Sequence, residues 1–168
     1  MEDSPGPGAA APLRGTLGAS YLEKAELRLA ALAFYLERGG YSDVIREAQE
    51  CVELALKGML RHLGIEPPKQ HDVGALITAS AELLPVAVRE SAERLAAISK
   101  WPRKEREFAF YGDVDFLPTE EYSAADAQRA IDDAAFVVAI ASAVVRAGPP
   151  RLGGRPDSGS GSGAAAGL

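Results

Sequence analysis

The feature that most constrains this chain is an apolar stripe between positions 44 and 63, which recurs at steps of three and four residues. A stripe with this spacing lies on one face of an α-helix and must be covered by other parts of the chain. Its members are Val44, Ala48, Cys51, Val52, Ala55, Leu56, Met59, Leu60 and Leu63. Ser42 or Asp43 is expected to cap the start of this helix, and Gly64 is expected to end it.

Similar stripes predict helices on both sides of this one. The first should run from about residue 20 to residue 38 and bury Leu22, Ala25, Leu29, Leu32, Ala33 and Leu36. A third helix, capped by Asp72, should bury Val73, Leu76, Ile77 and Leu83. A fourth, after Pro85, should carry on one side Val88, Ala92, Leu95, Ala96 and Trp101. Pro102 should kink or split this fourth helix, because proline lacks an N–H group.

The last predicted helix begins at Ser123, with Asp126 three positions later as the acidic partner of a capping box. Its apolar face should comprise Ala127, Ala130, Ile131, Ala134, Val137, Val138, Ala141, Val144 and Val145. No segment alternates polar and apolar residues with a period of two, so a sheet is not expected. We therefore predict an all-α, up-and-down helical bundle of four or five main helices.

Both ends of the chain are rich in Gly, Pro, Ala and Ser and contain few large apolar residues. Such segments bury too little apolar area to offset the ~1–2 kcal/mol of conformational entropy lost per ordered residue. The predicted organisation is a disordered tail over residues 1–15, one bundle domain over residues 16–147 and a second disordered tail over residues 148–168.

The formal net charge is −6, with 24 acids against 18 bases, so the chain lacks the basic balance typical of nucleic-acid binders. Contact with RNA would need a local basic patch, and residues 100–106 provide a candidate. The single cysteine, Cys51, excludes an intrachain disulfide, and its place on the apolar stripe predicts a buried, inert thiol. No membrane span or signal peptide is predicted, which favours a cytoplasmic protein.

Four segments, in this order and spacing, resemble the HEPN family, particularly its small stand-alone prokaryotic members. They are residues 48–57, 69–73, 106–113 and 122–127, and the resemblance extends over roughly residues 21–146. It implies a helical bundle that forms a homodimer. It also implies a minimal nucleotidyltransferase as the partner, in a toxin–antitoxin-like pair.

The resemblance also implies where a functional site would lie. Many members of the family are metal-independent ribonucleases whose motif is an arginine, a polar residue and, four to six residues beyond the arginine, a histidine. Arg106 and Glu107 match the first two positions, but Tyr111 stands where the histidine is expected. Tyrosine, with a pKa of about 10, is a poor general base near neutral pH. In some family pairs the partner adds AMP to a nearby tyrosine, for which Tyr111 is an imperfect match.

Three hypotheses follow. The first is a dimeric module that binds RNA or nucleotide through the segment formed by Arg103, Lys104, Arg106, Glu107 and Tyr111. The second is a divergent metal-independent ribonuclease toxin, with Arg106 and Tyr111 as its catalytic residues. The third is a structural dimer whose partner supplies all the chemistry.

No cofactor or metal site is predicted. The two histidines, His62 and His71, lack the cysteine or carboxylate spacing of a metal site. A cluster of acidic residues around a predicted loop is expected to be solvated. Its members are Asp113, Asp115, Glu120 and Glu121.

Overall fold

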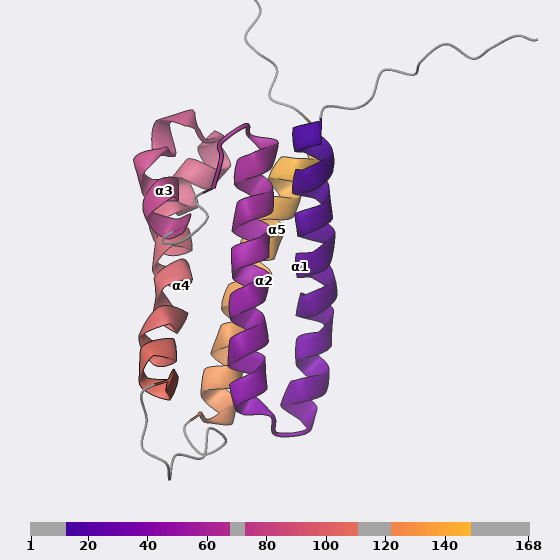
Figure 1. Ribbon diagram of the computed structural model, residues 1–168, viewed down its shortest axis with the longest axis vertical. Coiled ribbons are helices and arrows are strands. Elements are labelled where there is room, and N and C mark those ends of the chain that lie inside the picture. The colour runs from indigo at the N-terminus through magenta and orange to yellow at the C-terminus, as the bar shows by residue number, and fades with distance from the viewer. Residues whose placement is uncertain (1–12, 68–72, 111–121, 149–168) are drawn as a thin grey trace, which may run out of the picture.

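The computed structural model describes residues 13–67, 73–110 and 122–148, and within them the side chains of residues 17–67, 73–100 and 122–148. This part of the chain contains helices and no strand. The helices are α1 (Leu13–Glu37), α2 (Tyr41–His62), α3 (Val73–Ala79), the short 3-10 helix η1 (Ala81–Leu83), α4 (Val86–Phe110) and α5 (Ala124–Arg146). Figure 1 shows the long helices lying side by side, with α1 at one edge and α4 at the other. The predicted all-α bundle is confirmed.

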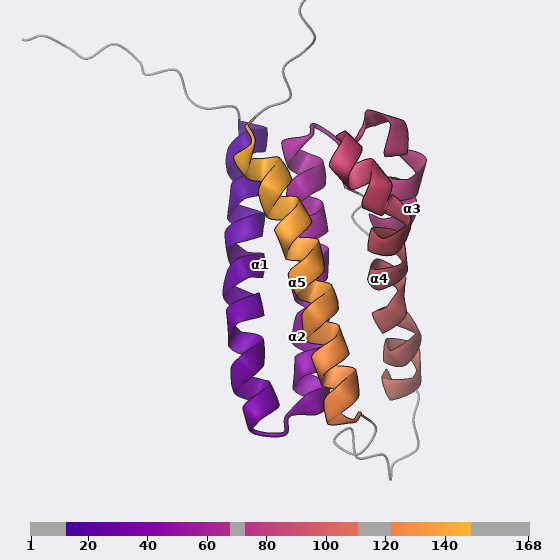
Figure 2. The ribbon, with the colours of Figure 1, turned by 180° about the vertical axis from the view of Figure 1, so that it is seen from behind.

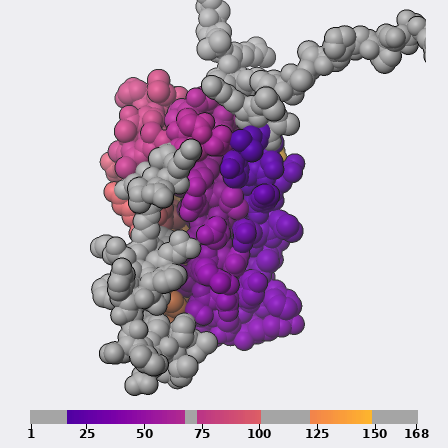
Figure 3. Space-filling view, in the orientation of Figure 1, coloured from indigo at the N-terminus to yellow at the C-terminus, as the bar shows by residue number. Residues whose placement is uncertain are grey.

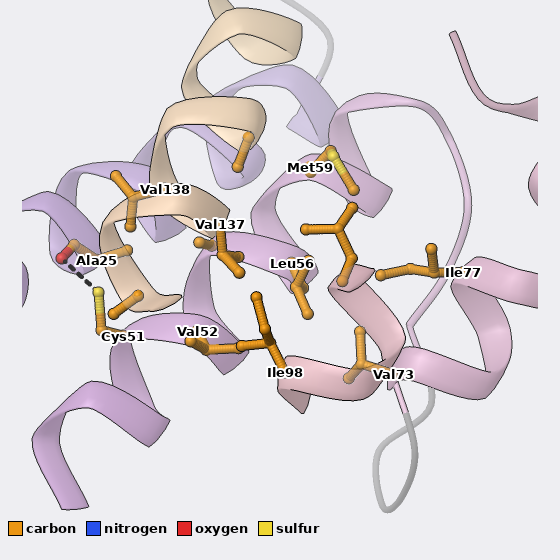
Figure 4. Packing of buried hydrophobic residues seen from close by; sticks show 14 of the residues in the cluster. Ala25, Cys51, Val52, Leu56, Met59, Val73, Ile77, Ile98, Val137 and Val138 are labelled. Carbon is orange, nitrogen blue, oxygen red and sulfur yellow. Dashed lines mark hydrogen bonds between the residues drawn. The ribbon is translucent and has the colours of Figure 1, made fainter. Parts of the chain in front are cut away.

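The core is built around α2, which packs on α1 and α5 and more lightly on α4. Seen from behind, α5 lies across α2, between α1 and α4 (Figure 2). Every member of the predicted α2 stripe is buried except Leu63, which is half-buried against the core. Leu56, only 1% exposed, lies among side chains of α3, α4 and α5 in Figure 4. The stripe between positions 44 and 63 therefore organises the bundle as predicted.

The start of α2 differs from the prediction. Gly40 occupies the N-cap position, and no side chain caps the helix, so neither Ser42 nor Asp43 has the predicted capping role. The physical reason is the tight turn after α1, in which Gly39 adopts a φ of 72° and returns the chain to helical geometry within a few residues. Asp43 then lies in the first turn of α2, where its charge interacts favourably with the helix dipole.

Helix α1 begins at Leu13, seven residues before the predicted start, and ends within one residue of the predicted end. Its predicted buried stripe is confirmed for Leu22, Ala25 and Leu32, whereas Ala33 is exposed. The early turns extend along α2 because a glycine in each helix, Gly18 and Gly58, allows the two backbones to touch.

The third predicted helix is shorter than expected. It ends at Ala79, and the 3-10 turn η1 follows, in which the spacing of side chains differs from that of an α-helix. Leu83 is consequently 74% exposed, which contradicts its predicted core position, and Leu84 is buried in its place. Pro85 then precedes α4, and its carbonyl oxygen accepts hydrogen bonds from the N–H groups of Val88 and Arg89.

Helix α4 continues without interruption through Pro102 to Phe110, so the proline does not split it. A proline inside a helix lacks one backbone hydrogen bond, and the helical backbone nonetheless continues on both sides of Pro102.

The last helix begins as predicted. Ser123 Oγ accepts a hydrogen bond from the Asp126 N–H at 3.2 Å, and Asp126 Oδ2 accepts one from the Ser123 N–H at 2.9 Å. This is the reciprocal arrangement of a capping box. None of the helices in the described residues is long and apolar enough to cross a membrane.

Candidate functional site

The residues predicted to contact RNA lie at the end of α4. Arg103, Lys104, Arg106 and Glu107 occupy its last two turns, where the structure describes the helical backbone but not the side chains. Tyr111 lies outside the described residues. The structure thus places four of the five candidates on consecutive turns of one helix, and the predicted contact between them and RNA stays a prediction.

The opposite end of α4 borders an apolar groove of about 870 Å³. Its walls come from the η1–α4 corner and from α5, and Leu63 and Gly148 also line it. The side chains on the α5 wall are Phe136, Ala139, Ile140, Ala143 and Val144. Position 106 lies about 30 Å along α4 from Val86, at 1.5 Å per residue, so the groove and the basic segment are separate features.

Sequence reasoning missed this groove because it assigned Leu83 to the core. In the structure Leu83 lines the groove, and the neighbouring Val86 is 65% exposed. The sequence does contain one sign of this exposure, the adjacent residues Leu83 and Leu84 directly before Pro85. Only one of two adjacent residues in such a turn can face the core, so the other must be exposed.

A histidine connects α2 to the end of α5 beside this groove. His62 Nε2 lies 3.2 Å from the carbonyl oxygen of Gly148. A carbonyl oxygen can only accept, so Nε2 carries the proton in this contact. His62 is therefore engaged in a link between helices.

Ion pairs also hold the helices to one another. Arg94 of α4 lies 3.9 Å from Asp133 of α5, and its guanidinium stacks 3.6 Å above the centre of the Phe136 ring. Arg146 at the end of α5 pairs with Glu26 of α1 at 2.7 Å, and Arg28 of α1 pairs with Glu47 of α2. The Arg94 and Arg146 contacts link α5 to α4 and to α1, and the Arg28 contact links α1 to α2.

The predicted buried thiol is confirmed. Cys51 is fully buried, and its Sγ donates a hydrogen bond to the carbonyl oxygen of Ala25 at 3.2 Å, drawn as the dashed line in Figure 4. Burial raises the pKa of the Cys51 thiol to about 12, against the smaller opposing effect of the nearby Arg28 charge. The thiolate needed for nucleophilic or metal chemistry is thus disfavoured.

The remaining candidates for acid–base or metal chemistry lie outside the described residues, namely His71, Asp113, Asp115, Glu120 and Glu121. Among residues 17–67, 73–100 and 122–148, no group of three or more His, Cys, Asp or Glu side chains could hold a metal ion.

Comparison with protein families decides the family of this chain. Residues 19–144, three quarters of the sequence, match the HEPN domain. The chain belongs to the HEPN family. The matched range begins in α1 and ends in α5, so it contains the whole bundle and the segment around Arg106. Comparisons of this HEPN protein with curated proteins and with solved structures find no match.

Proposed function

We propose that this HEPN protein is a cytoplasmic dimeric module that binds RNA or nucleotide at the end of α4. The residues that carry this site are Arg103, Lys104, Arg106, Glu107 and Tyr111. The observation that supports the proposal most strongly is the HEPN match over residues 19–144, which includes Arg106 followed by a polar residue on α4.

The chemistry of these residue types suits a phosphate-bearing ligand. An arginine presents a planar fork of N–H donors that fits two phosphate oxygens, and a tyrosine ring offers a face on which a base can stack. The net charge of −6 would repel a nucleic acid at long range. Attraction must therefore come from the few basic side chains of this segment, and RNA binding should weaken as the salt concentration rises.

A dimer would place two such segments in one cleft. Helix α4 lies at the edge of the bundle in both views and packs chiefly on α3 (Figures 1 and 2). This position leaves the α4 edge available for a second copy. We further propose that the dimer acts with a minimal nucleotidyltransferase in a toxin–antitoxin-like pair. Co-purification with a nucleotidyltransferase encoded by the neighbouring reading frame would support this pairing, and separate elution of the two proteins would contradict it.

The test for the RNA site uses labelled single-stranded RNA with the wild-type protein, Arg106→Ala and the matched control Arg129→Ala. Arg129 is exposed on α5 and its substitution removes the same charge. We expect binding without cleavage in the wild type and in the control, and weaker binding in Arg106→Ala. Binding that ignores the Arg106 substitution would remove this residue from the site.

The same experiment separates binding from catalysis. RNA cleavage that persists in the control and disappears in Arg106→Ala would make this protein a ribonuclease toxin despite Tyr111 in the place of the histidine. The absence of any RNA or nucleotide binding would leave a structural dimer whose partner supplies the chemistry.

A further inference from the structure

Helix α1 is apolar on two opposite faces. Its inner face carries Leu22, Ala25 and Leu32, which are buried against α2 and α5. Its outer face carries a second stripe, in which Leu27 is 74% exposed and Phe34 is 54% exposed. The usual surface helix presents polar residues on the side opposite the core. An apolar outer stripe over about two turns therefore points to a partner that covers it.

The outer stripe has small residues at its centre and charges at both ends. Ala30 and Ala31 lie between Leu27 and Phe34, and all four are exposed. One helical turn before Leu27 come Glu23 and Lys24, and one turn after Phe34 come Glu37 and Arg38. At 3.6 residues per turn these eight positions share one face. Figure 3 shows α1 along the edge of the molecule, at the side away from α3 and α4.

The charges at the two ends are available to a partner. Within the described part of the chain, the side chains of Glu23, Lys24 and Glu37 form no ion pair, and all three are exposed. Arg38 covers the neighbouring Phe34 ring, with its guanidinium carbon 3.6 Å from the ring centre. The exposed Phe34 ring is thus covered by the long, flexible side chain of Arg38 and not by core residues.

The order of these residues is self-complementary under a two-fold axis. If two α1 helices lie antiparallel with the axis between Ala30 and Ala31, Leu27 of one copy faces Phe34 of the other. The same operation brings Lys24 opposite Glu37 and Glu23 opposite Arg38, so each end gains two pairs of opposite charge. A two-fold interface requires such matching of one surface with itself. Alanines at the crossing point allow the helix axes to approach closely, near the short end of the usual 8–10 Å.

We propose that residues 23–38 of α1 form a self-association surface, on which a second copy of this chain packs its own α1 antiparallel. This surface lies at the edge of the bundle opposite α4 (Figures 1 and 2). It is therefore distinct from the α4 edge, where the proposed RNA-binding segments would meet. A protein that uses both surfaces assembles into tetramers or longer arrays, and one that uses only α1 forms a dimer.

The test is a charge-swap series measured by sedimentation velocity over a range of micromolar concentrations. Lys24→Glu alone places an acid opposite Glu37 of the other copy, and Glu37→Lys alone places a base opposite Lys24. Each single variant should raise the dissociation constant of this interface at least about tenfold and lower the average mass. The double variant Lys24→Glu/Glu37→Lys restores opposite charges and should recover the mass of the wild type.

The matched control is Arg129→Glu, which makes the same charge change as Lys24→Glu, at an exposed position of α5. This control should leave the average mass unchanged. A wild-type protein that stays monomeric, or single variants with the mass of the wild type, would overturn the proposal. Reduced mass in the single variants without recovery in the double variant would overturn the antiparallel register. Because RNA binding at α4 is measured separately, its absence would contradict only the function proposed above.

Discussion

The backbones of Gly18 and Gly58 touch across the α1–α2 interface. A Cβ atom added to Gly18 would lie 2.8 Å from the carbonyl oxygen of Gly58, and one added to Gly58 would lie 2.8 Å from the carbonyl oxygen of Gly18. Neither oxygen belongs to a side chain that could rotate away. The backbones of α1 and α2 are therefore held, at these two positions, at a spacing that only glycine permits.

Gly58→Ala should destabilise the protein although it improves the helix. Alanine gains about 1 kcal/mol of helix propensity over glycine. Forcing two packed backbones apart costs about 1–3 kcal/mol, so the cost should prevail. Urea unfolding of the variant measures the net free energy, and Ala97→Gly at an exposed position of α4 measures the propensity difference alone. A Gly58→Ala variant that is more stable than the wild type would contradict the close contact.

Leu56→Ala should lower the free energy of unfolding by about 2–5 kcal/mol, because it leaves a cavity at the centre of the core. Leu56 is 1% exposed at the middle of α2. Chemical denaturation of the two proteins provides the measurement, with Leu83→Ala, at a position of η1 that is 74% exposed, as the exposed comparison. A loss of less than about 1 kcal/mol would place Leu56 outside the core range.

The capping box should make α5 sensitive to acid. The hydroxyl of Ser123, which donates to Asp126 Oδ2 at 2.6 Å, and the Ser123 N–H together hold the pKa of Asp126 below its ordinary value. A lowered pKa contributes stability that is present above the unfolded value of about 3.9 and is lost as the pH falls through the folded value. The melting temperatures of the wild type and Asp126→Asn should therefore converge as the pH falls from about 6 to about 3. A difference in melting temperature that stays constant with pH would show that the charge of Asp126 does not stabilise the helix.

Native Cys51 should resist thiol reagents at pH 8. With a pKa of about 12, the thiolate is about a thousandfold scarcer than for an ordinary cysteine, and the side chain is fully buried. Labelling should be slow in buffer and rapid in denaturant, followed by mass spectrometry. Fast labelling of the folded protein would indicate that α1 and α2 separate readily around Ala25.

The helices could be predicted because their signals are local. The stripe around Leu56 and the pairing of Ser123 with Asp126 depend only on residues a few positions apart. The errors have tertiary causes. Ser42 does not cap α2 because the turn at Gly39 and Gly40 places Gly40 at the N-cap position. Leu83 is exposed because it lies in a 3-10 turn, in which its side chain points away from the core.

The functional site could be predicted only in part. Periodicity cannot reveal the groove beside Leu84, because its two walls come from α4 and α5, far apart in the sequence. The outer stripe of α1 was hidden for a different reason. Leu27 and Phe34 fall outside the predicted apolar face of α1, and only the position of α1 at the edge of the bundle shows that the described helices leave them exposed.

The division of the bundle into two unequal parts affects how it would respond to a ligand. Helices α1, α2 and α5 form one closely packed group, whereas α4 packs chiefly on α3 and lightly on that group. Such an arrangement favours local opening of the α3–α4 hairpin at a lower free energy than global unfolding. Hydrogen exchange should therefore be faster in α4 than in α2. A ligand held at the end of α4 would slow exchange in the hairpin while leaving the protection of the three-helix group nearly unchanged.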